Sequence, residues 1–489
     1  AGTQFFFTFM DFEAFGALES ERLRVHWEDS GTEGHVPRGV DLQLAARRLN
    51  RALRLSFHGA PTALGPRGLE RVRADVLDVL ETLAGEPGAK THAPARPEVR
   101  FGPIDVGALD AALVGYLPAP EEAARAVGLA SVPGLREVLR SQLFPNGSPR
   151  WLERIETPLG ASGLLCLPLF ADELGASTPE ALAARVTEAV LLARRAGVRA
   201  FSLAGMLPAY TGFGREVLHR LAQRDGAAEG LAFTTGHATT VVAVVRSVLA
   251  AATAVGLDLS EAEVAFVGVG SIGAAAAELL LQVATHPRSL ILCDLPRAAR
   301  RMEEVATHLR EQYGFRGHIE TAQASGAVAD VVYRARLIVG AASTPGALEV
   351  DRLAPGTVLV DDSFPALVDV PAAWARMRTR GDVLIVGGGL LDCGAVTRTV
   401  DDTAIPSGLR PTLLRGIART GVASCQLEPL LRRAHPELPP VSGPVEATTA
   451  HHYWRVALAS GIEAAPLHLG TELIPNSVLA TLTGHERTG

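Results

Sequence analysis

The chain contains the run Val264-Ala265-Phe266-Val267-Gly268-Val269-Gly270-Ser271-Ile272-Gly273, in which G-x-G-x-x-G follows directly on four apolar residues. The apolar residues predict a buried parallel strand, and the residues from Ile272 to Gln282 predict a helix. In a dinucleotide-binding fold the first glycine makes a tight turn, the second lets backbone approach a pyrophosphate, and the third lets helix and strand pack closely. Strand, motif and helix occur here in the order that such binding requires. The alternative is a plain strand-turn-helix.

Strands and helices alternate regularly after this motif begins. Apolar runs predict strands at Val264–Val267, Ser289–Cys293, His318–Thr321, Leu337–Gly340, Thr357–Asp361 and Val383–Val386. Helical patterns fall between most of them, and such alternation predicts parallel β-α-β units wound on both faces of a sheet. The predicted fold class is α/β: a doubly wound parallel-sheet Rossmann domain, a second mixed α/β catalytic or substrate domain, and an extra N-terminal region.

The same pattern sets the predicted domain boundaries. Residues 256–425 hold all six strands and form the predicted Rossmann dinucleotide-binding domain. Residues 151–255 mix strand and helix patterns, and together with the mainly helical residues 426–489 they form the predicted substrate and catalytic domain. Residues 1–150 show no recognisable chemistry and are predicted to be an accessory region of unknown function. Within them, the apolar spacing of Leu42–Leu55 predicts a helix.

The composition is that of a soluble globular protein, with 489 residues, 47% hydrophobic residues and a net charge of −7. The absence of a polybasic arm argues against nucleic acid as a partner. No apolar run is expected to span a bilayer, and Phe5-Phe6-Phe7 lacks the basic flank of a signal peptide, so we expect a cytoplasmic protein. The only lysine is Lys90, which argues against mechanisms built on a catalytic lysine.

Four cysteines are spread along the chain and predict neither disulfides nor a metal site. They are Cys166, Cys293, Cys393 and Cys425. Cys393 ends the run Gly387-Gly388-Gly389-Leu390-Leu391-Asp392-Cys393 after the sixth strand, at the edge of a parallel sheet where ligands bind. A thiolate there can attack a thioester and form an acyl-enzyme, which a nicotinamide can reduce to an aldehyde. The alternative is a small buried thiol. Cys293, in a strand, and Cys425, in a helix, are expected to be core thiols.

A second polar segment, Phe233-Thr234-Thr235-Gly236-His237, leads into a long apolar helix. Thr234 and Thr235 either cap this helix or bind substrate. His237 either protonates the product or bonds a backbone carbonyl. Asp392 raises the pKa of the adjacent Cys393, so a positive group such as His237 or a helix N-terminus has to offset it. The predicted catalytic residues are therefore Cys393 and His237.

Several segments together resemble the cyanobacterial long-chain acyl-(acyl-carrier-protein) reductases over roughly residues 151–470. The similar segments are Phe233–Gly236, the helix with Arg246, Gly268–Gly273, Val360–Pro365, the glycine run before Cys393, and the surroundings of Cys166 and of Cys425 with Glu428. The resemblance implies a catalytic domain joined to a dinucleotide domain, reduction of fatty acyl thioesters to aldehydes, and an acyl-enzyme on Cys393. The chain departs from the family at His237, where asparagine is usual, and near Gly205, where hydroxyl residues are missing.

The predicted cofactor is NADH or NADPH. Asp294 ends the second predicted strand, where an acid accepts bonds from both ribose hydroxyls and repels a 2′-phosphate, which favours NADH. Arg297, Arg300 and Arg301 follow and keep NADPH open, and the resemblance implies NADPH. The predicted cofactor contacts are Gly268, Gly270, Ser271, Ile272, Gly273, Asp294, Ser343 and Gly388.

The sequence therefore predicts NAD(P)H-dependent reduction of an acyl thioester, on an acyl carrier protein or on CoA, to an aldehyde. The alternatives are another NAD(P)-dependent dehydrogenase on the same fold and a non-catalytic nucleotide-binding scaffold. Because carrier proteins are usually acidic, Arg194, Arg195 and Arg199 are a candidate docking patch; the alternative is a solvated helix end. The oligomeric state stays open.

Overall fold

The computed structural model describes residues 5–7, 42–49, 52–59, 98–120, 134–224, 226, 228–401, 421–470 and 472–485. The chain divides into two compact units, Ala1–Ala93 and Pro94–Gly489. The predicted accessory region, residues 1–150, therefore extends past the first unit, and much of it lies outside the described residues.

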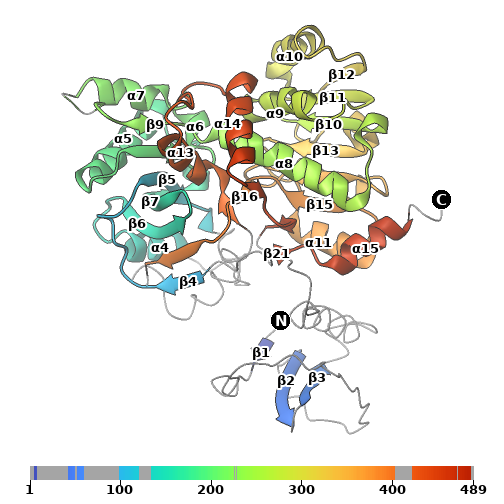
Figure 1. Cartoon of the computed structure of the whole chain (residues 1–489), viewed down its shortest axis with the longest axis horizontal. Helices are drawn as coiled ribbons and strands as arrows, with labels where there is room; N and C mark the ends of the chain where they lie inside the picture. The colour runs from blue at the N-terminus through green and yellow to red at the C-terminus, as the bar shows by residue number, and fades with distance from the viewer. Residues whose placement is uncertain are drawn as a thin grey trace. The chain divides into compact units, whose positions relative to one another are not determined.

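The described residues of the first unit form a three-stranded sheet of β1 (Phe5–Phe7), β2 (Leu42–Leu49) and β3 (Ala52–Gly59), drawn in blue in Figure 1. β2 and β3 pair antiparallel, and β1 pairs parallel with β2. The helix predicted over Leu42–Leu55 is therefore wrong. Apolar residues at positions 42, 44, 53, 55 and 57 recur at every second position, and runs this short fit a strand as well as a helix.

A six-stranded parallel sheet forms one half of the second unit. Its strands are β10 (Glu263–Val267), β11 (Ser289–Asp294), β12 (His318–Gln323), β13 (Leu337–Gly340), β14 (Val358–Asp361) and β15 (Leu384–Gly387). They lie in the order β12-β11-β10-β13-β14-β15, and all neighbours are parallel. This is the 3-2-1-4-5-6 order of the Rossmann fold. The six predicted strands and the predicted α/β fold class are confirmed.

Helices flank this sheet, whose strands are buried and apolar, as is usual for parallel sheets. The helices are α8 (His237–Val255), α9 (Ser271–Val283), α10 (Ala299–Glu311) and α11 (Val370–Thr379). α9 follows β10 directly and packs against α8. The predicted helix after the glycine motif is thus confirmed, and its first turn lies at the C-terminal edge of the sheet.

α8 is 19 residues long and apolar enough to cross a membrane by length and composition alone. The expectation that no apolar run could span a bilayer is corrected on this point. In its most apolar window 78% of the residues are buried inside the protein. α8 is thus a core helix, and no other helix in the described part of the chain has both the length and the hydropathy of a membrane span.

A seven-stranded mixed sheet forms the other half of this unit. Its strands are β4 (Glu98–Phe101), β5 (Ala111–Leu117), β6 (Arg150–Thr157), β7 (Gly160–Phe170), β8 (Ala200–Leu203), β9 (Ala232–Phe233) and β17 (Thr397–Val400). The order is β4-β17-β6-β7-β5-β8-β9, with β7, β5, β8 and β9 parallel and β6 antiparallel to its neighbours. The predicted boundaries cut through this sheet, because β4 and β5 precede residue 150 and β17 lies within 256–425.

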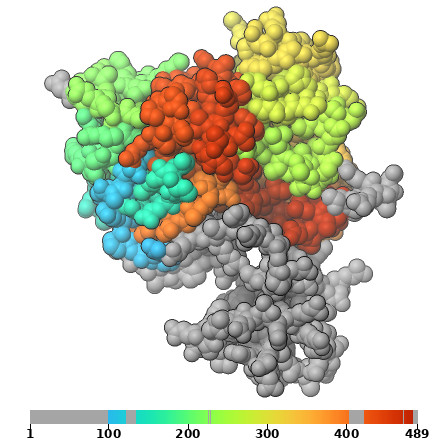
Figure 2. Space-filling view, in the orientation of Figure 1, coloured from blue at the N-terminus to red at the C-terminus, as the bar shows by residue number. Residues whose placement is uncertain are grey.

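Six helices of the described residues complete this half, and the last two of them lie between the two sheets. The six are α4 (Leu135–Leu143), α5 (Pro179–Arg195), α6 (Leu207–Tyr210), α7 (Arg215–Ala222), α13 (Ser424–Ala434) and α14 (Ala447–Ala459). In Figures 1 and 2 the orange-red α13 and α14 lie between the seven-stranded half and the Rossmann half. α13 contacts both α8 and the strands β5 and β8. Its first turn is therefore held where the two halves meet.

The remaining C-terminal elements are short, except for the last helix. They are β16 (Leu390–Asp392), β18 (Val422–Ala423), β19 (Glu463–Ala464), β20 (His468–Leu469), β21 (Glu472–Leu473) and α15 (Asn476–His485). β16 pairs antiparallel with both β18 and β19, so it ties the chain after β15 to the strand that leads into α13.

Candidate functional site

The three glycines of the motif meet three different steric demands. Gly268 has a φ of 89°, and a Cβ there would overlap the backbone of Ala341. A Cβ on Gly273 would overlap the carbonyl oxygen of Gly268, so this glycine permits the close approach of α9 to β10. Gly270 has open space where its Cβ would stand. Such a loop, at the start of a helix, leaves room for a pyrophosphate, and the residues present therefore fit a dinucleotide.

Asp294 ends β11 beside this loop. Its Oδ2 accepts a hydrogen bond from Val269 N at 2.7 Å, and its Oδ1 accepts one from Leu295 N at 2.7 Å. These bonds fix the carboxylate at the C-terminal end of the sheet, where the ribose of a dinucleotide lies in this fold. Each carboxylate oxygen has a second lone pair, so both can still accept a hydroxyl.

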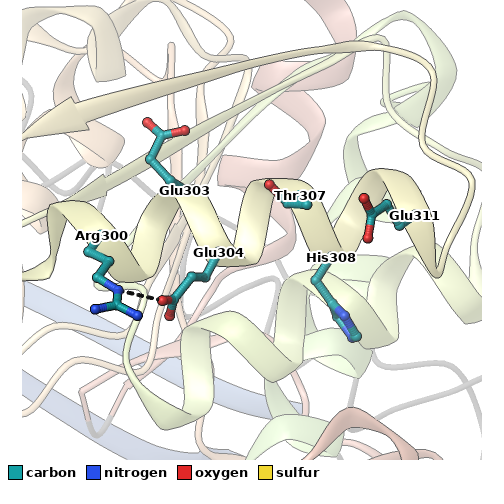
Figure 3. A pocket seen from close by; sticks show the side chains of 6 residues that line it. All are labelled: Arg300, Glu303, Glu304, Thr307, His308 and Glu311. Atoms are coloured by element: carbon teal, nitrogen blue, oxygen red, sulfur yellow. Dashed lines mark hydrogen bonds and ion pairs between the residues drawn. The ribbon is translucent and has the colours of Figure 1, made fainter.

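Of the arginines after Asp294, Arg297 and Arg300 are exposed and Arg301 is partly buried. Arg300 on α10 is 92% exposed and pairs with Glu304, Nε to Oε1, at 2.8 Å (Figure 3). A hollow along α10 is lined by Arg300, Glu303, Glu304, Thr307, His308 and Glu311. All six side chains come from one helix, and three of them are carboxylates. This hollow is therefore poorly suited to a phosphate.

Two adjacent carboxyls, Asp361 and Asp362, lie at the C-terminal end of β14. Asp361 accepts hydrogen bonds from Ser363 N at 2.9 Å and from Leu367 N at 2.7 Å, so it shapes the loop after the strand. Asp362 faces Gly389, because a Cβ on that glycine would stand 2.5 Å from its Oδ1. Burial, and after it the charge of Asp361, raises the pKa of Asp362 well above its usual range.

The other predicted cofactor residues on this edge differ in exposure. Ser343 is exposed in the loop after β13, and Ile272 is partly buried in the first turn of α9. Gly388 is buried, and its N–H donates to Asp361 O at 3.0 Å. The Gly388 N–H therefore already has a partner within the protein.

His237 and Ser271 connect α8 to the start of the dinucleotide-binding helix. His237 Nδ1 lies 3.0 Å from Ser271 Oγ, which also accepts a hydrogen bond from Val445 N at 2.9 Å. The histidine thus bonds a serine hydroxyl rather than a backbone carbonyl. Burial lowers the pKa of His237 to about 4, so the ring is neutral near neutral pH. It supplies no positive charge to a neighbouring thiol.

Glu428 on α13 binds the start of α8 from outside that helix. Its carboxylate accepts hydrogen bonds from the Thr234 hydroxyl, from Gly236 N at 3.2 Å and from Thr239 N at 2.8 Å. The N-cap of α8 is Gly236, which has no side chain to cap the helix. A carboxylate from another helix therefore takes the place of a cap, at the positive end of the α8 dipole.

Thr234 and Thr235, the predicted substrate residues, are fully buried. The Thr234 hydroxyl donates to Glu428, and the Thr235 hydroxyl accepts from His237 N at 3.4 Å. The N-cap of α8 is Gly236, so neither threonine caps this helix as the N-cap residue. Both hydroxyls have partners within the protein.

Cys393 lies on the segment that leaves the Rossmann sheet for the seven-stranded sheet. The charges nearest its thiol are those of Asp392 and Arg398, and the next residue, Gly394, faces Pro158. The side chain is 8% exposed, and burial, with Asp392 next, raises the pKa of its thiol to about 12. β16 separates Cys393 from the end of β15, and the place of this cysteine beside a nicotinamide stays a prediction.

Cys425 is the thiol at the junction of the two halves. It is the second residue of α13 and is partly exposed, whereas the other three cysteines are buried. Ser424 N donates to Gly389 O at 3.0 Å, which ties the start of α13 to the loop after β15. A Cβ on Gly236 would overlap Cys425, so the cysteine packs on the turn before α8. The helix predicted here is confirmed, and the thiol itself is enclosed at the junction of the two halves.

The charges around Cys425 come from both halves. Burial, followed by the charges of Asp362 and Glu428, raises the pKa of its thiol to about 12. Hydrogen bonds from the backbone of Gly205, just after β8, and of Cys425 itself act in the opposite direction. The thiol therefore needs a proton acceptor before it can act as a nucleophile near neutral pH.

Sequence reasoning missed Cys425, Asp362 and Glu428 as members of one site. The available signal was the run Val422-Ala423-Ser424-Cys425, a short apolar strand that leads straight into a helix. That pattern places the cysteine in the first turn, where backbone N–H groups lack partners within the helix. The contacts that complete the site join residues more than 30 positions apart, and no local pattern predicts them.

Neither a protein-family model nor a curated protein matches this chain. Among solved structures, the hetero-hexameric glutamate dehydrogenase of Thermus thermophilus is similar at 17% identity over 78% of this chain and 81% of that one, with a TM-score of 0.32. L-Tryptophan dehydrogenase from Nostoc punctiforme has 12% identity over 78% and 89%, with a TM-score of 0.28. A short chain alcohol dehydrogenase from E. coli CFT073, complexed with NADH, has 20% identity and a TM-score of 0.21; the match covers 30% of this chain and spans 42% of that enzyme.

Proposed function

We propose that this protein reduces an acyl thioester to an aldehyde with NAD(P)H, through an acyl-enzyme on Cys425. The observation that carries the proposal is the position of this thiol. Its backbone partner, Gly205, follows β8 of one sheet, and its charged neighbour, Asp362, follows β14 of the other. In α/β proteins with open parallel sheets, ligands bind at the C-terminal ends of the strands. A substrate held by one half can therefore meet a dinucleotide held by the other at this sulfur.

The residues around the thiol suit acyl transfer. The sulfur of Cys425 forms a bond to the thioester carbon, and the bond from that carbon to the carrier sulfur breaks. Ser424 N already donates to Gly389 O, but the other backbone N–H groups in the first turn of α13 lack intrahelical partners and can stabilise the negative charge that develops on the carbonyl oxygen. A bound nicotinamide supplies the hydride that converts the acyl group into an aldehyde. Release of the aldehyde then breaks the bond between the acyl carbon and the sulfur, and the free Cys425 side chain is restored.

The choice of Cys425 over Cys393 rests on geometry. Cys393 is 8% exposed, and its nearest charges belong to the strands beyond β15. Cys425 lies in the first turn of a helix next to Gly389, at the edge of the Rossmann sheet. The resemblance to the acyl-(acyl-carrier-protein) reductases supports the reaction, since it includes the surroundings of both cysteines, and the geometry favours Cys425 as the nucleophile.

The cofactor preference that we propose is NADH. The carboxylate of Asp294 is fixed beside the glycine loop by two backbone N–H groups, so a 2′-phosphate on the ribose would meet its negative charge. Arg300 is paired with Glu304 and does not offset this repulsion. The proposed substrate carrier is an acyl carrier protein or CoA, and the proposed location is the cytoplasm.

The arginines suggested as a carrier-docking patch lie at the opposite end of β8 from Cys425. Arg199 precedes β8, Arg194 and Arg195 form the last turn of α5, and Gly205 near the thiol follows the other end of the strand. Basic residues in a last turn also stabilise the helix through its dipole. The alternative of a solvated helix end therefore has the better support.

The proposed function is tested by mixing the protein with NADH or NADPH and acyl-CoA thioesters of several chain lengths. We expect one aldehyde and one free thiol for each cofactor oxidised. In a parallel assay with NAD+ or NADP+ and small alcohols, oxidation of an alcohol without any thioester turnover would support the other dehydrogenase. Cofactor binding without turnover of any substrate would support the scaffold.

A further inference from the structure

Asp362 is a carboxyl whose charge acts on the thiol of Cys425. It directly follows β14, with its Oδ1 against Gly389. The carbonyl of Gly389 accepts the hydrogen bond of Ser424 N at 3.0 Å, and Ser424 directly precedes Cys425. Carboxyl, glycine loop and thiol are therefore consecutive neighbours across the junction of the two halves, and the charge of Asp362 acts on the thiol.

Asp362 differs from its neighbour Asp361 in how its oxygens are used. Both oxygens of Asp361 accept backbone hydrogen bonds within the loop after β14, which is a structural role. The carboxyl of Asp362 instead lies against Gly389, and the group affected by its charge is the thiol of Cys425. Asp361 thus shapes the loop, and Asp362 is available for proton transfer.

We propose that Asp362 is the general base and acid of the reaction, and that it exchanges a proton with the thiol of Cys425. This inference rests on the proposed acyl-thioester reduction. As the sulfur of Cys425 bonds to the thioester carbon, its S–H bond breaks and the proton moves to the carboxylate of Asp362. The carbon–sulfur bond to the carrier breaks next, and the departing thiolate takes that proton and leaves as a thiol. Reduction of the acyl group then uses one hydride and one proton from solvent, which restores the Cys425 thiol.

The surroundings of Asp362 suit this exchange. The titratable groups that face it or its partner are Asp361 on β14, Cys425 and Glu428 on α13, and His468 on β20 behind Gly387. Burial lowers the pKa of His468, so this ring adds no positive charge near neutral pH. Burial and Asp361 raise the pKa of Asp362, while that of the thiol is about 12, so the carboxylate is a stronger base than an ordinary aspartate.

The test compares two reactions of Cys425 in full-length wild type and Asp362→Asn. The first is alkylation by iodoacetamide between pH 6 and 10, followed by peptide mass spectrometry. The second is acylation by acyl-CoA without NAD(P)H. Asparagine removes the negative charge, so we expect alkylation near pH 8 to rise about tenfold, as for a pKa lowered by one. We expect acylation to fall by about 10²-fold, because the proton acceptor is lost. A merely structural role would lower both rates together.

Controls separate this inference from the proposed function. Asp392→Asn removes a charge beside Cys393 and should leave both rates unchanged, whereas formate should partly restore acylation of Asp362→Ala. If Asp362→Asn acylates at the wild-type rate, or if both reactions slow together, Asp362 is not the base. If wild type forms no acyl-Cys425 at all, the proposed function fails, and the alkylation profiles still show whether carboxyl and thiol are coupled.

Discussion

The glycine loop offers a matched pair of variants that separates cofactor binding from folding. Gly270 has φ −76° in the extended region and open space at the position of a Cβ, so Gly270→Ala strains nothing in the protein. A Gly→Ala change at such a site stabilises a fold by about 0.4–1 kcal/mol, because the unfolded chain loses freedom. The added methyl group would nevertheless stand where the pyrophosphate is expected, and we expect NADH affinity to fall at least tenfold, about 1.4 kcal/mol.

Gly273→Ala should behave in the opposite way. A Cβ at this position overlaps the carbonyl oxygen of Gly268 and comes within 3.4 Å of the Ala341 side chain. The backbone of the loop has to move, and overpacking of this kind costs about 1–3 kcal/mol. The gain of about 1 kcal/mol for alanine over glycine in a helix offsets part of this cost. We expect a net loss of stability of up to about 2 kcal/mol.

Both variants are measured by urea unfolding and by titration with NADH. The reasoning predicts a stable Gly270→Ala protein that binds NADH weakly and a destabilised Gly273→Ala protein. If Gly270→Ala binds NADH as tightly as the parent protein, the cofactor does not lie on this loop, and the geometric argument for the dinucleotide site is refuted.

Three further predictions concern single side chains. Glu428→Leu leaves the donors at the start of α8 without an acceptor, so urea unfolding should show a loss of about 3 kcal/mol, whereas Glu428→Gln should lose less. His237 has a folded pKa of about 4 against 6.5 in the unfolded chain, so the unfolded state binds the proton first and stability falls as the pH drops from 6.5 to 4. The difference corresponds to roughly 3 kcal/mol, and His237→Asn should flatten the profile; an unchanged profile would show that another group titrates. Asp294→Ser removes the charge at the ribose position and should raise affinity for NADPH relative to NADH in parallel titrations; an unchanged ratio would contradict the proposed preference.

The Rossmann half was predictable because its signals are local. Strands of a parallel sheet are covered on both faces, so β10, β11 and β13 appear in the sequence as continuous apolar runs. The motif glycines add a turn whose steric demands the structure reproduces at Gly268 and Gly273. Six strands, their helices and the fold class could therefore be predicted from residues close together in sequence.

The second sheet was not predictable in the same way, because its pairings are distant in sequence. β17 pairs with β4, almost 300 residues before it, and with β6, and no local pattern indicates either partner. The domain boundaries placed at residues 150 and 256 therefore missed β4, β5 and β17. The helix predicted where β2 and β3 form a hairpin was wrong for a different reason. The short apolar runs of this segment fit both a helix and a strand.

The candidate site shows the same division between local and distant signals. Position after a predicted strand drew attention to Cys393, and that strand was correct. What brings Cys425 to the edge of the sheet is a hydrogen bond from Ser424 to Gly389 and packing on Gly236. These contacts depend on the folded arrangement of the two halves, so a cysteine in a helical pattern could only be interpreted as a core thiol.

The central claim, that Cys425 carries the acyl group, is tested most directly by locating a covalent adduct. Wild type, Cys425→Ser and Cys393→Ser are incubated with acyl-CoA without NAD(P)H, and intact and peptide masses are recorded. We expect one acyl group on the peptide with Cys425 in wild type and in Cys393→Ser, and none in Cys425→Ser, whose hydroxyl is a far weaker nucleophile. An acyl group on Cys393 that persists in Cys425→Ser would contradict the account.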